Sequence, residues 1–172
     1  MVAASGVGGA RSTSAGVTIS LPARWRLLGD DERSSLGDLT TDESVRLIAV
    51  SDRQVGEYHP TLVVTGGELD TEDSDEAVYT DSALRLSETF PGFHMIDDYA
   101  WPVNPKGARL RTGIYILDDL SLTVSQWVWI THQRSQGNGR VLWSATGTSP
   151  TILYPDMLKD FVDMIPSVEV AL

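Results

Sequence analysis

The chain has 172 residues, and its 13 basic and 24 acidic side chains give it a formal net charge of −11. Nucleic acids and anionic membranes attract basic surfaces, so this charge disfavours both as partners. The sequence has no cysteine, which excludes disulfides, thiolate metal sites and cysteine catalysis. No apolar run approaches the roughly 20 residues of a membrane-spanning helix.

Residues 1–16 are mostly glycine, alanine, serine and threonine, a composition that buries too little surface to order itself. We therefore expect a flexible tail over 1–16 and a single folded domain over 17–172. The GVGG stretch at 6–9 has no strand before it and no helix after it, so it does not predict a phosphate-binding loop. The tail lacks the apolar core of a signal peptide, which predicts a cytoplasmic protein, although a chain that begins after a cleaved export signal would show the same pattern.

Three strands are expected in the first half of the domain. Residues 17–22 alternate apolar and polar side chains, and Pro22 closes this strand. Residues 44–52 and 61–66 also have the composition of strands. The backbone just before the strand at 61–66 is expected to be extended, because His59 precedes a proline.

A helix is expected to follow, ending at Pro91-Gly92. Acidic residues crowd its beginning, where they stabilise the positive end of the helix dipole, and Ser74 or Asp75 can cap it. Apolar residues at i, i+4, i+7 and i+11 indicate one buried face. This stripe is Tyr79, Ala83, Leu86 and Phe90.

The second half of the chain predicts a four-stranded antiparallel meander and a last helix. Short turns of hairpin chemistry join the strands. The strands are expected over 93–103, 108–118, 121–131 and 139–147. Pro155 suits the first turn of the helix, and Pro166 ends it. Its expected apolar stripe is Leu158, Phe161, Val162 and Ile165.

Together these elements predict an α+β fold, an antiparallel sheet of six or seven strands sandwiched between helices that bury their apolar faces on it. Four segments resemble the Mog/PsbP-like fold family, in particular its actinobacterial LpqN/LpqT-like branch. They are SLPARW at 20–25, HPTLVVTGGEL at 59–69, ARLRTGIYI at 108–116 and the closing strand and helix at 141–170. The resemblance covers residues 17–170.

The resemblance implies an α/β/α sandwich and a role in binding other macromolecules or as an accessory factor. It implies no shared catalytic residues. The lipoprotein members of the branch carry a signal peptide and an acylated cysteine, and this chain departs from them by lacking both. Membrane anchoring is therefore not assigned.

Known catalytic and metal-site patterns are not met. His59, His94 and His132 lie in separate segments, so they form a metal site only if the fold gathers them. GTSPT at 147–151 lacks the second glycine of a nucleophile elbow. The acidic run at 68–76 lacks the spacing of a calcium loop and predicts a solvated helix N-terminus or, alternatively, a docking surface for a basic partner. We expect no cofactor, no metal and no enzymatic activity.

Two tryptophans, Trp127 and Trp129, lie on the otherwise polar side of the strand at 121–131. If the meander pairs in simple register, the same sheet face also carries Tyr115, Arg109, Arg111 and Arg140. These residue types are enriched at protein interfaces, so the six form the candidate binding site. The alternative is that a helix covers the tryptophans, whose burial stabilises a fold by roughly 1.5–3 kcal/mol each.

This face leads to two functional hypotheses. The first is a non-enzymatic binding or adaptor domain for a protein partner of unknown identity. The alternative is a small-molecule carrier whose pocket lies between a helix and the sheet. A homodimer closed through this face would also account for its aromatic residues.

Overall fold

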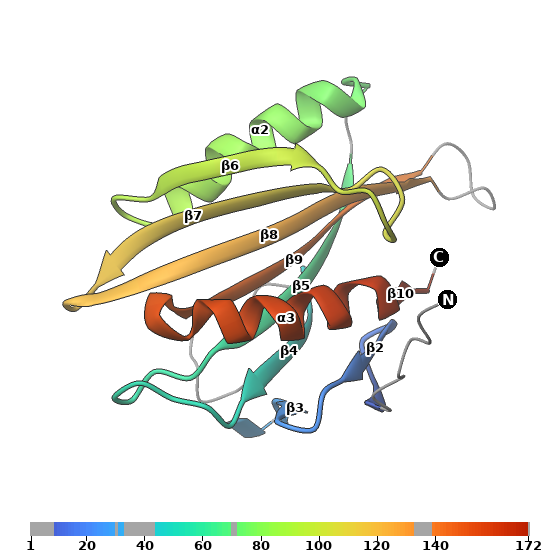
Figure 1. Cartoon of the computed structure of the whole chain (residues 1–172). Coiled ribbons are helices and arrows are strands. Elements are labelled where there is room, and N and C mark those ends of the chain that lie inside the picture. Colours follow the sequence, from blue (N-terminus) through green and yellow to red (C-terminus); the bar gives the residue numbers. More distant parts are fainter. Residues whose placement is uncertain (1–8, 30, 33–43, 70–71, 133–138, 172) are drawn as a thin grey trace, which may run out of the picture.

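The computed structural model describes residues 9–29, 31–32, 44–69, 72–132 and 139–171. Within these residues, the main sheet has seven antiparallel strands in the order β3-β4-β5-β9-β8-β7-β6 (Figure 1). The strands are β3 (Trp25–Leu27), β4 (Val45–Ser51), β5 (Thr61–Leu69), β6 (His94–Ala100), β7 (Arg109–Leu117), β8 (Leu120–His132) and β9 (Arg140–Pro150). The predicted meander is therefore confirmed as β6 to β9, and β5 pairs with its last strand.

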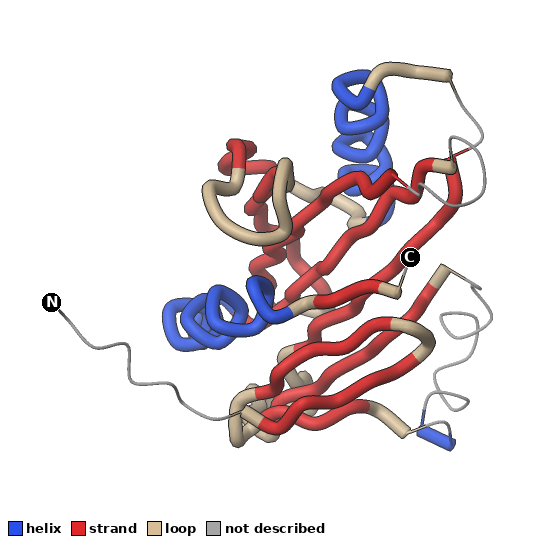
Figure 2. The backbone as a smooth tube through the Cα atoms, turned by 90° about the vertical axis from the view of Figure 1, so that its right-hand side faces the viewer, coloured by secondary structure: helices blue, strands red, loops and turns tan. Residues whose placement is uncertain are grey.

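The sheet lies between two layers (Figures 1 and 2). Helix α2 (Asp75–Thr89) packs on one face. Helix α3 (Tyr154–Met164) packs on the other face, together with a small sheet in the order β1-β2-β10. The small sheet consists of β1 (Ala10–Ser14), β2 (Val17–Leu21) and β10 (Glu169–Val170), and the 3-10 turns η2 (Thr151–Leu153) and η3 (Ile165–Ser167) flank α3. The predicted α+β sandwich is confirmed.

Helix α2 begins where its sequence predicts. Ser74 is the N-cap, and its hydroxyl accepts a hydrogen bond of 3.3 Å from the Ala77 amide. Leu86 and Phe90 pack with Tyr115 of β7 in a small apolar cluster, so the predicted stripe does face the sheet.

Helix α3 and the turn after it confirm part of the predicted stripe, because Phe161 and Ile165 are both fully buried. Met157, Phe161 and Met164 are buried, whereas Val162 is exposed. Met157 and Met164 thus replace Leu158 and Val162 on the buried face. The helix lies in the angle between β9 and β2, and methionines fill the space against them because an unbranched side chain adapts to an irregular gap.

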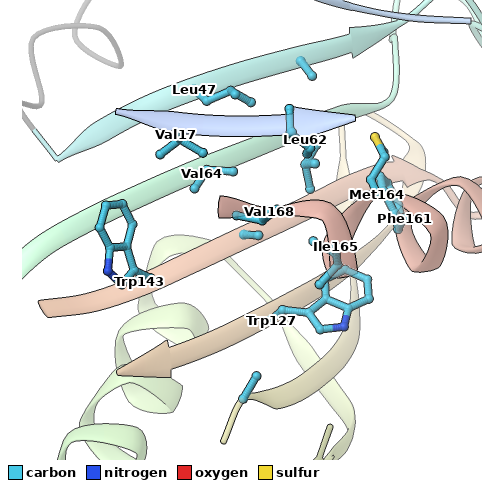
Figure 3. Packing of buried hydrophobic residues seen from close by; sticks show 14 of the residues in the cluster. Val17, Leu47, Leu62, Val64, Trp127, Trp143, Phe161, Met164, Ile165 and Val168 are labelled. Atoms are coloured by element: carbon cyan, nitrogen blue, oxygen red, sulfur yellow. The ribbon is translucent and has the colours of Figure 1, made fainter. Parts of the chain in front are cut away.

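The main hydrophobic core lies on the α3 face of the sheet, and Figure 3 shows its centre. Side chains from β2, β4, β5, β8, β9 and α3 meet there. Trp25 contacts Phe161 edge-on at 5.6 Å between ring centroids, and its indole Nε1 donates to Asp160 at 2.8 Å. Strand β2 contributes Val17 and Ile19, both fully buried.

The expected tail over 1–16 was wrong for its second half. Ala10–Ser14 form β1, which pairs with β2 through a two-residue turn in which Ala15 and Gly16 both have positive φ. Such a turn matches the twist of a hairpin. Backbone hydrogen bonds and an ion pair between Arg11 and Glu169 of β10 order this segment, although most of its side chains are exposed. Residues 1–8 lie outside the described residues.

Candidate partner-binding surface

The two tryptophans of β8 are core residues. Trp127 is 0% exposed and lies on the Phe161 ring of α3, with 6.2 Å between the ring centroids, as Figure 3 illustrates. Trp129 is also buried and stacks on Trp143 of β9 at 6.4 Å. Helix α3 covers the face that carried the predicted binding site, so a partner has no access to these rings.

The six predicted site residues do not share one face. Leu110 pairs with Trp127, whereas Arg109 pairs with Val128 and Tyr115 pairs with Leu122. Paired residues project to the same face of an antiparallel sheet. The tryptophans therefore face α3, and Arg109, Arg111 and Tyr115 face α2. The error arose from register, because a shift of one residue moves every side chain of a strand to the other face.

Arg111 is a buried structural cation that fastens α2 and β6 to β7. Only 1% of its side chain is exposed. Its guanidinium donates to the Ser82 hydroxyl at 2.8 Å, to the Tyr79 carbonyl and to the Gln126 amide oxygen at 3.2 Å. Asp98 of β6 lies 3.3 Å from Nε. Burial lowers the pKa of Arg111, and the nearby carboxylate of Asp98 opposes that shift.

The other predicted site residues on the α2 face also make contacts that stabilise the fold. Arg109 donates through Nε to Asp98 at 2.9 Å. Arg140 donates to the Asp73 carbonyl at 2.7 Å and binds Asp75, which ties β9 to the N-terminus of α2. Tyr115 contacts Phe90 at 4.7 Å between ring centroids, and burial raises the pKa of its hydroxyl.

These contacts also bear on the carrier hypothesis and on a dimer through the tryptophan face. The Phe161 ring fills the space above Gly147 so closely that a Cβ at that position would lie 2.7 Å from it. Met157 and Trp25 pack in the same cluster. Protein side chains therefore occupy the space between α3 and Trp127, and a pocket or a second subunit at this place has no support.

A different part of the α3 face is open. Helix α3 and η2 reach across the sheet as far as β8, where the Tyr154 hydroxyl lies 2.7 Å from Ser125 Oγ and Thr151 Oγ1 lies 3.0 Å from Thr123 Oγ1. Beyond β8, apolar side chains on β6 and β7 become exposed. Ile96 is 60% exposed, Tyr99 is 42% exposed and Ile116 is 71% exposed.

We call Ile96, Tyr99, Ile114 and Ile116 the β6–β7 surface. Tyr99 pairs with Leu110, and Leu110 packs in the core on the α3 side, which places Tyr99 on that side of the sheet. Ile116 pairs with Ser121, whose hydroxyl bonds Thr151 of η2 at 2.9 Å. Burial raises the pKa of the Tyr99 hydroxyl, and the nearby Asp97 and Tyr154 raise it further. These apolar residues thus continue the α3 face past the edge of the helical layer.

Strand β6 is also an edge of the main sheet, as Figure 1 shows at the end of the meander. Just past β6, the Trp101 amide donates to the Ala108 carbonyl at 2.8 Å. Backbone groups alternate in direction along a strand. The N–H and C=O groups of Ala100 and Asp98 consequently point away from β7. The ladder has an irregularity between Met95 and Asp97, which places Ile96 at a bulge.

The sequence does contain a signal for this surface, although the prediction missed it. Residues 93–103 form the first strand of a meander, and the first strand of a meander lies at a sheet edge unless another segment pairs with it. Its residues also mix apolar and charged side chains on both sides, which is typical of an edge strand.

No metal-binding cluster of three histidine or carboxylate residues occurs within the described part of the chain. Its histidines lie apart. His59 contacts the Ser51 carbonyl at 3.0 Å, and His132 lies 3.9 Å from Asp75. Among the described residues, no helix has the length and apolar character that a membrane crossing requires.

No protein-family model and no curated protein sequence matches the chain. Solved structures do. LpqN from Mycobacterium tuberculosis, a protein involved in cell envelope biogenesis, is 17% identical and superposes with a TM-score of 0.68 over 98% of this chain and 88% of LpqN. The solution structure of cyanobacterial PsbP (CyanoP) from Synechocystis sp. PCC 6803 is 15% identical, with a TM-score of 0.55 over 99% of this chain and 98% of CyanoP.

The chain has the PsbP/LpqN-like fold. The resemblance that the sequence predicts is thereby confirmed for the fold, which LpqN and CyanoP share. At 15–17% identity, the comparison concerns the fold alone.

Proposed function

We propose that the protein is a non-enzymatic binding domain that contacts a protein partner through the β6–β7 surface. The observation that carries the proposal is the exposure of Ile96, Tyr99 and Ile116 on one side of a sheet edge that α3 leaves open. Apolar side chains that are scattered singly need no explanation, but several exposed isoleucines and a tyrosine on two paired strands at a sheet edge are typical of a protein interface. The likeness of the fold to LpqN, which is involved in cell envelope biogenesis, supports an accessory role.

The test compares three forms of the full chain as bait in extract of the source organism. Ile96→Ser/Ile116→Ser removes the apolar character of the surface. Leu84→Ser is the matched control, because Leu84 is 61% exposed but lies on α2 at the opposite face. We expect wild type and the control to retain the same protein and the double variant to lose it at least tenfold.

The substituted side chains Ile96, Ile116 and Leu84 are all exposed, so wild type and both variants should have the same thermal unfolding midpoint. Differences in binding are then not caused by unfolding. The proposal fails if the double variant retains the protein as well as the control does. It also fails if wild type retains no specific protein.

A further inference from the structure

We propose that the partner of the β6–β7 surface binds as an added β-strand, an extended basic segment that pairs with the open edge of β6. This inference rests on the proposed function and specifies how the partner is held. Strand addition derives its affinity from backbone hydrogen bonds at a sheet edge and its specificity from the side chains beside that edge. Both features are present on β6.

The backbone of β6 offers the hydrogen bonds. The Trp101 amide points toward β7, because it donates to the Ala108 carbonyl. Since backbone groups alternate along a strand, Asp98 and Ala100 each direct one N–H donor and one C=O acceptor away from β7. The Asp98 carboxylate binds Arg109 and Arg111, so this part of the edge is held rigidly in an extended form. A rigid edge lowers the conformational cost of adding a strand.

The side chains beside the edge set the character of the partner. Ile96 and Tyr99 lie at the α3 side of the edge, and they would contact apolar side chains at alternate positions of an added strand. Asp97 is an exposed carboxylate on the same side, because it pairs with Thr112, two positions from the Leu110 that pairs with Tyr99. Asp98 lies on the α2 side, and its charge is already matched by two arginines. A segment that carries a basic residue and an apolar residue two positions apart, on the side that faces Asp97 and Tyr99, therefore complements this edge.

Charge also separates this partner from a second copy of the chain. Two copies each carry a formal charge of −11 and repel one another. Pairing of β6 with β6 across a two-fold axis would also place two Asp97 carboxylates in one short ladder, and like charges across a ladder destabilise it. The bulge at Ile96 and the carboxylates are the usual protection of an edge against self-pairing. The bulge and the carboxylates therefore disfavour pairing with a second copy, and they favour pairing with a basic strand.

The experiment measures binding of the fluorescent heptapeptide Thr-Val-Thr-Lys-Thr-Val-Thr, which carries valine and lysine on one face, by fluorescence anisotropy with the full chain. Two further peptides serve as controls. One replaces lysine with glutamate, and the other carries N-methyl groups on alternate backbone nitrogens. We expect each change to weaken binding at least tenfold. Equal affinity for the lysine and glutamate peptides, or no binding of the lysine peptide at millimolar concentration, would overturn the inference.

A variant of the edge tests the backbone directly. Ala100→Pro removes the outward N–H, and proline is tolerated on an edge strand where that group faces solvent. Ala100→Ser keeps the N–H and is the matched control. We expect Ala100→Pro to lose binding at least tenfold and Ala100→Ser to retain it. In wild type, the amide exchange of Asp98 and Ala100, followed by NMR, should slow at least tenfold when the peptide binds.

These outcomes are separable from the proposed function. The proposed function stands if Ile96→Ser/Ile116→Ser loses the captured protein. Strand addition is nevertheless overturned if Ala100→Pro retains that protein and the amides of Asp98 and Ala100 stay unprotected from exchange. A dimer that light scattering detects for wild type and not for Ala100→Pro would show that the occupant of the edge is a second copy, which also overturns the inference.

Discussion

Trp127 of β8 and Phe161 of α3 form an edge-to-face pair, with ring centroids 6.2 Å apart and planes inclined at 63°. Both rings are fully buried. The pair joins the last helix to the middle of the main sheet, and Trp101 from the β6–β7 connection also contacts Trp127 edge-on at 5.7 Å between ring centroids. Trp127, a residue of the predicted binding site, is thus packed against two aromatic rings of its own chain.

Replacement of Trp127 by alanine is expected to destabilise the fold and to affect partner binding only through unfolding. Loss of a buried aromatic ring costs about 3–5 kcal/mol, because the cavity that remains does not collapse fully. Leu84→Ala, at an exposed position of α2, should change the free energy of unfolding by less than about 0.5 kcal/mol. Urea denaturation measures both values. A Trp127→Ala protein with the stability of wild type would contradict the assignment of Trp127 to the core.

Gly147 of β9 is required by the close approach of Phe161. A Cβ at position 147 would lie 2.7 Å from the ring, so Gly147→Ala forces the ring or the helix to shift and should cost about 1–3 kcal/mol. Gly67 of β5 is the matched control, because a Cβ there meets nothing within 4 Å. Gly67→Ala should leave stability unchanged or raise it by up to about 1 kcal/mol. Thermal unfolding distinguishes the two variants, and equal midpoints would refute the packing argument.

The elements that local chemistry determines could be predicted from the sequence. Helix α2 has a serine cap, acidic residues in its first turn and a Pro-Gly stop, all within 20 residues of one another. The β6–β9 meander follows from apolar alternation and from turn residues between the strands. Each of these signals acts over a few residues, so a single sequence is sufficient to detect them.

The candidate site could not be predicted because it depends on contacts between distant residues. The pairing of Leu110 with Trp127 decides which face Arg111 occupies, and nothing in either strand specifies that register. The side of the sheet that α3 covers decides that Trp127 is buried and Ile96 is exposed. Strand β1 likewise has few apolar residues and forms because β2 offers it backbone hydrogen bonds.

Asp98 is expected to matter for stability far more than its neighbour Asp97. Asp98→Asn removes the carboxylate that matches the buried Arg111 guanidinium, and an uncompensated buried charge costs about 3 kcal/mol or more. Asp97→Asn changes an exposed carboxylate and should alter the free energy of unfolding by less than about 0.5 kcal/mol. Urea unfolding of both variants at neutral pH measures the difference. Similar values for the two would show that the Arg111 network does not hold β6 and α2 in place.

Stability should fall at alkaline pH because of the half-buried tyrosine Tyr58. Burial raises the pKa of its hydroxyl, and proximity to Tyr115 raises it further. In the unfolded chain a tyrosine releases its proton near pH 10, whereas folded Tyr58 keeps it to higher pH. The folded state therefore binds more protons above about pH 10, and the free energy of unfolding decreases there by up to about 1.4 kcal/mol per pH unit. Below pH 10 this contribution is constant.

The slope of stability against pH, from urea unfolding between pH 8 and 11, tests this assignment. Tyr58→Phe should make the decline above pH 10 shallower, while removal of the hydroxyl should cost about 1 kcal/mol at pH 8 through its lost hydrogen bonds. Tyr99→Phe is the matched control, because Tyr99 lies on the exposed β6–β7 surface and its loss should reduce the slope less. If the free energy of unfolding of Tyr58→Phe declines above pH 10 as steeply as that of wild type, the alkaline loss of stability originates at another group.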